Sequence, residues 1–181
     1  MKNRLAASGF RPLGPDLTPS DGSVGLDKLA ARLATFVEQH VSSEEQFDLV
    51  GFSMGGIIAR YYVQRMGGIR RVERLITISA PHHGTYTAYA MGNCGARQMR
   101  PGSVFLKELN QDAALLEQVR FVSIWTPFDV MIAPATSSRL GVGKEFRIPV
   151  AMHPWMLTSK RVLATVEKLL REQGQTQTLP A

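Results

Sequence analysis

A serine placed between two regular elements constrains this chain more than any other feature of its sequence. The apolar run 47–50 leads into Gly51-Phe52-Ser53-Met54-Gly55, and a helix-patterned segment, 54–66, follows at once. The pattern G-x-S-x-G, placed after a strand and before a helix, predicts a sharp turn that lifts the serine hydroxyl clear of the backbone. Glycines on both sides of the serine are the small residues that such a turn needs. A glycine-rich connection with an incidental serine is the alternative.

Short apolar strands alternate with amphipathic helices along the rest of the chain. Residues 75–78 and 121–125 are dense in β-branched and aromatic side chains and predict strands, and 145–150 predicts a weaker one. Residues 25–41 and 159–174 each carry one apolar stripe at helical spacing. This alternation indicates βαβ units, so the predicted fold class is α/β, with a mostly parallel sheet covered by helices on both faces.

The length and composition fit one domain that spans residues 1–181. Of these residues 44% are apolar and 20% charged, which is ordinary for a globular protein. Residues 80–118 lack a clear strand or helix pattern. Residues 175–181 are expected to fray.

Charge and cysteine content narrow the choice of partners. The formal net charge of +6 is spread along the chain, without a basic run that interleaves with aromatics, so nucleic-acid binding is not expected. The single cysteine, Cys94, cannot form an internal disulfide and is read as a structural or exposed thiol. No apolar stretch is long enough for a secretory signal or a membrane span, so a cytoplasmic location is the default expectation.

A serine nucleophile needs a base to take its proton, and the base needs a carboxylate to orient it. In a sheet of this kind the acid and then the base follow the serine in chain order, each beyond a later strand. Asp129 follows the strand that ends near Trp125, and His153 follows the strand at 145–150, so both fit that order. The same turn aims the backbone N–H of Met54 at the place where a carbonyl oxygen would gain negative charge.

The other acidic and histidine residues fit this chemistry less well. Asp112 lies in an amphipathic segment, and Asp48 precedes the serine within its own strand. His40 ends an exposed helix, while His82 and His83 come before the acid, which is the wrong order. The adjacent histidines lack a cysteine or further histidine at ligand spacing, so hydrogen bonding within a loop is the favoured role and no metal or organic cofactor is expected. Each of the two chosen residues also has a purely structural alternative. Asp129 could cap a turn, and His153 could begin the last helix.

Taken together, these stretches resemble the bacterial lipases and esterases of the α/β-hydrolase superfamily. The resemblance rests on LVGFSMGGIIARYY, ITISAPHHGT, MRPGSVFLKELN, WTPFDVMIAPATS and HPWML, which occur in that order. It implies Ser53 as nucleophile, Asp129 as acid, His153 as base and the Met54 N–H as one oxyanion donor. It also implies that residues 80–118 cap the site. The candidates to line an acyl pocket are then Tyr86, Tyr89, Met91, Met99, Phe105 and Leu106, although packing of the cap onto the body explains them equally well.

The sequence departs from that family at its front. Such hydrolases usually carry a strand with a His-Gly-type motif whose following loop supplies the second oxyanion N–H, and no His-Gly precedes residue 51 here. The missing strand would lie between a strand expected at 10–17 and the strand at 47–50, which leaves a slot in the sheet. We expect either that the two flanking strands pair directly with each other or that a second copy of the chain fills the slot in a homodimer. A longer natural protein that supplies the missing strand is the third way to fill it.

The predicted activity is that of a serine carboxylic-ester hydrolase. It would act on short- to medium-chain acyl esters of small molecules or lipids through an acyl-enzyme. Two alternatives stay open. One is a truncated, inactive hydrolase-like domain that binds or assembles, and the other is acyl transfer to an alcohol or thiol, which uses the same three side chains.

Overall fold

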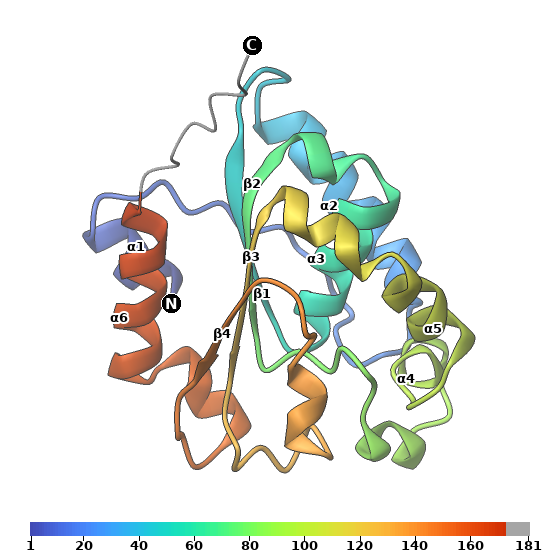
Figure 1. Ribbon diagram of the computed structural model, residues 1–181. Coiled ribbons are helices and arrows are strands. Elements are labelled where there is room, and N and C mark those ends of the chain that lie inside the picture. Colours follow the sequence, from blue (N-terminus) through green and yellow to red (C-terminus); the bar gives the residue numbers. More distant parts are fainter. Residues whose placement is uncertain (173–181) are drawn as a thin grey trace.

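The fold is built on one parallel sheet (Figure 1). The structure is a computed structural model that describes residues 1–172. The sheet contains the strands β1 (Phe47–Phe52), β2 (Val72–Ile78), β3 (Arg120–Trp125) and β4 (Lys144–Arg147), in that spatial order. Every neighbouring pair of strands is parallel. The predicted α/β class with a mostly parallel sheet is therefore confirmed.

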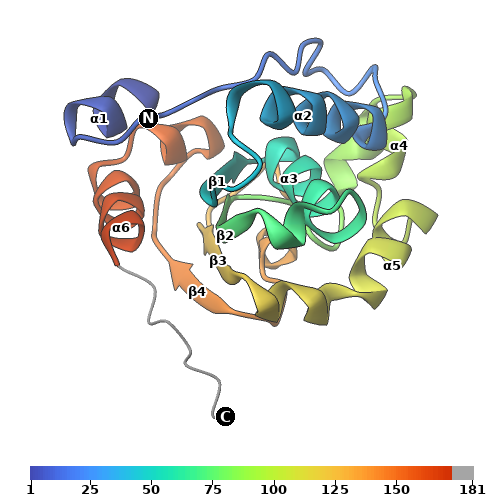
Figure 2. The same ribbon diagram turned by 90° about the horizontal axis from the view of Figure 1, so that it is seen from above.

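Helices cover the sheet on both faces, as the view from above shows (Figure 2). One face is covered by α2 (Leu26–His40) and α3 (Met54–Arg65), beside which lie α4 (Cys94–Gln98) and α5 (Val104–Gln111). The opposite face is covered by α1 (Lys2–Ala7) and α6 (Lys160–Arg171). In the part of the chain that the structure describes, no helix is long and apolar enough to cross a bilayer.

Short 3₁₀ helices complete the connections. They are η1 (Gly68–Arg70), η2 (Tyr86–Ala90), η3 (Ala113–Gln118), η4 (Ala135–Ser138) and η5 (His153–Leu157). Residues 80–118, for which no clear pattern was found, fold into η2, α4, α5 and η3. The side chains of Asn93 and Ser103 cap α4 and α5 by accepting hydrogen bonds from the N–H groups of Ala96 and Leu106.

Two hydrophobic cores lie on the two faces of the sheet. The first contains Leu29 of α2, Ile57 of α3 and Leu75 of β2, and the second contains Ile76 of β2 and Val166 of α6. Because successive strand residues point to opposite faces, neighbouring residues of β2 serve different cores. This explains why the strands read as continuous apolar runs rather than as alternating ones.

The strand predicted at residues 10–17 is wrong, since the structure has no regular element there. Pro12 and Pro15 lack the N–H groups that a ladder would need, so this segment cannot pair regularly with β1. The expectation that the strands would close up is therefore wrong as well. Among the described residues β1 is hydrogen-bonded to β2 alone, and its other edge borders a groove of 460 Å³.

This groove has apolar walls on both sides. It is lined by all six residues of β1, by residues of 10–17 and α2, and by Leu5, Gly55 and Leu170, among others. Leu49 and Val50 of β1 are only half-buried, whereas their partners on β2, Leu75 and Ile76, are fully buried. The slot that the sequence predicted beside the nucleophile strand is thus open in this structure.

Two further boundaries differ from the expectation. The strand predicted at 145–150 ends at Arg147, because Thr126 Oγ1 donates to the Val150 carbonyl at 2.7 Å and accepts from the Val150 N–H at 3.0 Å. These bonds draw the chain away from the β3 ladder. Helix α6 ends at Arg171, and the predicted end at Gly174 and the tail at 175–181 lie outside the described residues.

Candidate active site

Ser53 is the single residue between the end of β1 and the start of α3. Its backbone has φ 53° and ψ −126°, a conformation that costs free energy for any residue with a side chain. Two hydrogen bonds hold the turn. The Ser53 N–H donates to the Ile78 carbonyl at 2.8 Å, and the Ser53 carbonyl accepts from the Gly56 N–H at 2.9 Å.

The turn also depends on close packing between α3 and the end of β2. A methyl group added at Gly56 would lie only 2.5 Å from the Ala80 Cβ. Any larger side chain would therefore push the first turn of α3 away from the sheet. The small residues that follow Ser53 thus allow the first turn of α3 to pack closely against the end of β2, and this packing helps to hold the strained backbone of Ser53.

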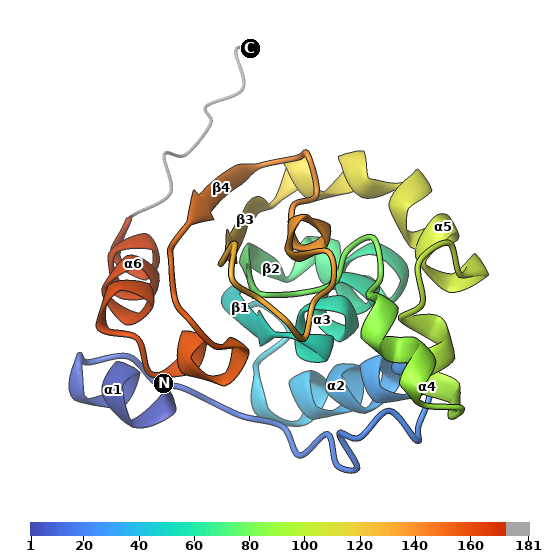
Figure 3. The same ribbon diagram turned by 90° about the horizontal axis from the view of Figure 1, so that it is seen from below.

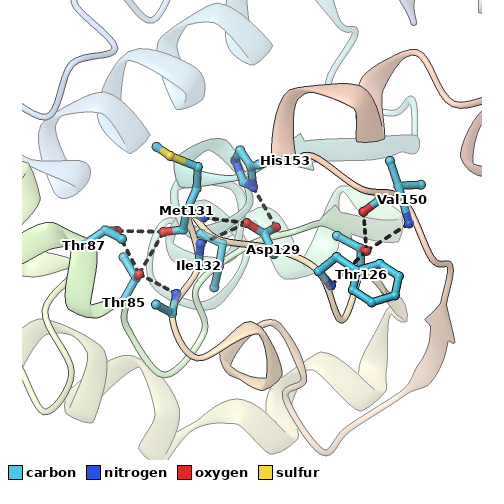
Figure 4. Close-up of polar contacts among 10 residues, drawn as sticks. Thr85, Thr87, Thr126, Asp129, Met131, Ile132, Val150 and His153 are labelled. Atoms are coloured by element: carbon cyan, nitrogen blue, oxygen red, sulfur yellow. Dashed lines mark hydrogen bonds and ion pairs between the residues drawn. The ribbon is translucent and has the colours of Figure 1, made fainter.

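Asp129 and His153 form a hydrogen-bonded pair at the same edge of the sheet (Figure 4). His153 Nδ1 lies 2.8 Å from Asp129 Oδ2, and both side chains are buried. Asp129 Oδ1 accepts further hydrogen bonds from the N–H groups of Met131 and Ile132, each at 3.0 Å. Burial acts to raise the pKa of Asp129, but the hydrogen bonds from His153 and from the Ile132 N–H outweigh it and hold that pKa below its usual value. The carboxylate is thus ionised and fixed in orientation.

The His153 ring packs against Phe52, the residue that immediately precedes Ser53. The two ring centroids are 4.6 Å apart. Within residues 1–172 no hydrogen bond joins the Ser53 hydroxyl to the ring, and such bonds are often loose in unliganded enzymes. With Nδ1 facing Asp129, Nε2 is the ring nitrogen that remains for proton exchange.

The Met54 N–H is available at the start of α3. Met54 is the first residue of that helix, and the first amides of a helix have no intrahelical acceptor. The partial positive charge of a helix N-terminus further favours an anion at this place. The arrangement can therefore support attack on a carbonyl group with negative charge developing on its oxygen.

Two threonines brace the loop that carries Asp129, and sequence reasoning missed both. Thr126 joins this loop to Val150, three residues before His153. Thr85 Oγ1 donates to the Met131 carbonyl and accepts from the Ala133 N–H, each at 2.9 Å (Figure 4). Thr126 directly follows the last residue of β3, and this position is the one feature of the sequence that could have pointed to it.

His82 lies in a buried polar cluster with Thr77 and Arg60. Its ring nitrogens lie 3.1 Å from Thr77 Oγ1 and 3.2 Å from Arg60 Nη1. Arg60 also donates to the carbonyl of Leu109 and to the side chain of Asn110, which ties α3 to α5. Burial, followed by the Arg60 charge, holds the pKa of His82 well below 6.5, and burial lowers the pKa of Arg60 to about 9. A neutral His82 in this position braces the loop after β2.

The six side chains named for an acyl pocket are not gathered in one place. Met99 and Leu106 are buried in the first core, while Phe105 stacks on Tyr61 with a centroid distance of 5.2 Å. Phe105 lines a hollow of 540 Å³ and Leu106 a separate one of 480 Å³, and neither includes Ser53. The other three, Tyr86, Tyr89 and Met91, are exposed.

Comparisons with known proteins agree with this fold. The family described as palmitoyl protein thioesterase matches residues 20–119, which is more than half of the chain. No curated protein matches the chain significantly. Among solved structures, the mature lipase BlEst2 of Bacillus licheniformis superposes with a TM-score of 0.66 at 16% identity, covering 82% of this chain and 75% of that one.

Two further solved structures have a similar fold. Aspergillus fumigatus lipase B matches with a TM-score of 0.68 at 16% identity, over 86% of this chain and 44% of that protein. The product of a Listeria innocua gene matches with a TM-score of 0.61 at 15% identity, over 86% of this chain and 70% of that one. The chain therefore spans less than half of the Aspergillus lipase. Likeness at such identities shows the fold, and the family match adds the sequence evidence: the chain belongs to the palmitoyl protein thioesterase family of α/β-hydrolases.

Proposed function

We propose that the protein hydrolyses carboxylic esters or thioesters of acyl groups through a covalent acyl-enzyme. The observation that carries this proposal is the Asp129–His153 hydrogen bond of 2.8 Å, with the His153 ring packed beside the strained Ser53 turn. Each member of the set then has one role. Ser53 is the nucleophile, His153 the base and Asp129 the residue that orients the base.

In the first half-reaction Ser53 Oγ attacks the acyl carbonyl carbon, and His153 takes the hydroxyl proton. The negative oxygen that forms is stabilised by the Met54 N–H. When the intermediate collapses, the bond to the alcohol or thiol breaks and His153 returns the proton to that leaving group. A water molecule then repeats the sequence on the acyl-enzyme and releases the carboxylic acid.

Two lines of support bear on the substrate. The sequence predicts short- to medium-chain acyl esters, whereas the family name refers to palmitoyl thioesters on proteins. Both bonds present the same acyl carbonyl to Ser53, so one mechanism serves both. Parallel assays with p-nitrophenyl butyrate and with a medium-chain acyl thioester separate the two bond classes by kcat/KM.

The test compares the natural chain with Ser53→Ala. The substitution removes the nucleophile and should lower kcat by at least about 10⁴-fold, while circular dichroism stays unchanged. Ser159→Ala is the control, because the Ser159 side chain makes no capping hydrogen bond and lies outside the site. Covalent labelling of Ser53 by an activated phosphonate should occur in the natural chain alone. Turnover retained by Ser53→Ala, or no turnover and no labelling of the natural chain, would refute the proposal, and the second result favours a binding domain.

A further inference from the structure

Large apolar side chains gather in the open around the Asp129–His153 pair. Across residues 1–172, seven large apolar side chains are more than half exposed, and six of them lie in η2, in the loop after β3 or in η5. We call these six the apolar rim: Tyr86, Tyr89, Phe128, Val130, Met131 and Trp155. The seventh is Val104, at the start of α5. An exposed cluster of this kind marks a contact surface rather than chance exposure.

Hydrogen bonds join the segments that carry the rim. The Tyr86 N–H donates to the Ala133 carbonyl at 2.8 Å, and Thr87 Oγ1 donates to the Met131 carbonyl at 2.7 Å. The Asp129–His153 bond connects the same loop to η5. Figure 3, which views the molecule from below, shows these segments together at the edge where the strands end. The segments that carry the rim thus lie together, and the Asp129–His153 bond of the site joins two of them.

The charge of this surface has one sign. Residues 80–100, 126–138 and 149–161 contain a single acidic residue, Asp129, which is buried against His153. The same segments contain Arg97, Arg100, Lys160 and Arg161. Arg100 lies over the Tyr89 ring with its Cζ 4.8 Å from the centroid, and Lys160 and Arg161 share a hollow with Trp155. Arg100, Lys160 and Arg161 therefore border the apolar side chains directly.

We propose that the apolar rim and its basic border dock the protein on an anionic phospholipid surface. Aromatic and aliphatic side chains can enter the headgroup region while arginine and lysine face anionic headgroups, the combination that interfacial proteins use. A second copy of the chain fits less well, since a twofold contact would place rim against rim and basic border against basic border. Docking in this orientation turns the Ser53 edge of the sheet toward the lipid.

The experiment measures binding to phosphatidylcholine vesicles, with and without phosphatidylserine, by co-sedimentation. The protein carries Ser53→Ala throughout, so the result does not depend on turnover and is separate from the test of the proposed function. Binding is expected to anionic vesicles and to weaken with added salt. Replacing Lys160 and Arg161 together by glutamine should weaken it about thirtyfold, since each basic residue near an anionic surface contributes about fivefold. Lys28→Gln with Lys107→Gln, two exposed lysines outside the rim, should leave it unchanged.

Val130→Asp tests the apolar part, with Val104→Asp as a matched control. Both valines are 71% exposed, but only Val130 belongs to the rim. Val130→Asp should weaken binding by about tenfold or more, because a carboxylate would replace an apolar group at the lipid surface, and Val104→Asp should not. Absence of vesicle binding, equal binding to neutral and anionic vesicles, or equal loss in the two aspartate variants would overturn the proposal. Vesicle-independent dimerisation that Val130→Asp abolishes would likewise overturn it and assign the rim to a protein contact.

Discussion

Replacing Gly51 by alanine should destabilise the protein far more than the same change four residues later, at Gly55. A methyl group at Gly51 would lie 2.6 Å from the Gly55 carbonyl oxygen, 2.7 Å from the Gly56 Cα and 2.8 Å from the Gly55 carbonyl carbon. Ordinary contact begins at 3.4 Å, so the first distance falls short by 0.8 Å. All three are backbone atoms, which cannot rotate away, and β1 must separate from α3. At Gly55 the added methyl would meet nothing within 4 Å.

These contacts set the expected magnitude. Overpacking costs about 1–3 kcal/mol, and three backbone clashes place Gly51→Ala at about 3 kcal/mol. Alanine in a helix is about 1 kcal/mol better than glycine, so Gly55→Ala should be slightly stabilising. The two free energies of unfolding should differ by about 4 kcal/mol. With a urea m-value of about 2 kcal/mol/M, the two unfolding midpoints should be about 2 M apart.

Equilibrium unfolding in urea, followed by circular dichroism and by tryptophan fluorescence, measures this difference. Coincident transitions in the two signals would validate a two-state treatment. Hydrolysis assays on the same samples report whether the Ser53 turn survives in Gly51→Ala. Equal midpoints for the two alanine variants would refute the idea that contact between β1 and α3 excludes a Cβ at residue 51.

Two further predictions concern Asp129 and His82. Asp129→Asn should lower kcat by about 10⁴-fold with a small change in KM, because the neutral amide no longer orients the His153 ring for proton transfer; Asp112→Asn, on a surface ion pair with Arg65, is the control. A kcat within tenfold of the natural value would contradict the assignment. Because the pKa of His82 lies well below 6.5 in the folded protein, the unfolded chain binds a proton first as the pH falls. The contribution of neutral His82 to the free energy of unfolding is then complete above about pH 6.5. It is lost as the pH falls, by up to about 1.4 kcal/mol per pH unit. Urea titrations between pH 7 and pH 5 should show this slope in the natural chain and a smaller slope in His82→Gln, where His83, whose pKa burial also lowers, still contributes; an unchanged slope in that variant would disprove the assignment.

The strand–turn–helix around Ser53 could be predicted because it depends on local chemistry. Glycines on both sides of one serine, between an apolar run and a helical pattern, leave few conformations to the chain. The closeness of Asp129 and His153 followed from chain order, since parallel strands bring the loops at their carboxyl ends to one edge. Their roles in catalysis stay predictions, as does the oxyanion role of Met54.

Other features depend on contacts that a sequence pattern does not encode. Residues 10–17 have strand-like apolar residues, but Pro12 and Pro15 leave them without a regular ladder. Met99 and Tyr86 both looked suitable for an acyl pocket, yet Met99 is buried in a core and Tyr86 lies in the open. Apolar character alone does not say whether a side chain will face a core, a ligand or solvent. The bonds of Thr126 depend on where a distant segment, at Val150, finally lies.

The open edge of β1 has a kinetic consequence for its amide protons. The Ser53 N–H points toward β2, and amide directions alternate along a strand, so the N–H groups of Gly51 and Leu49 point the same way. Those of Phe52 and Val50 then point into the groove. Hydrogen exchange along this one strand should therefore alternate: Leu49 and Gly51 exchange only when the sheet opens, while Val50 and Phe52 exchange from the folded state. Selective slowing of amide exchange at Val50 and Phe52 would therefore report any strand that pairs with this edge. Phe52 would report it at the residue directly before Ser53.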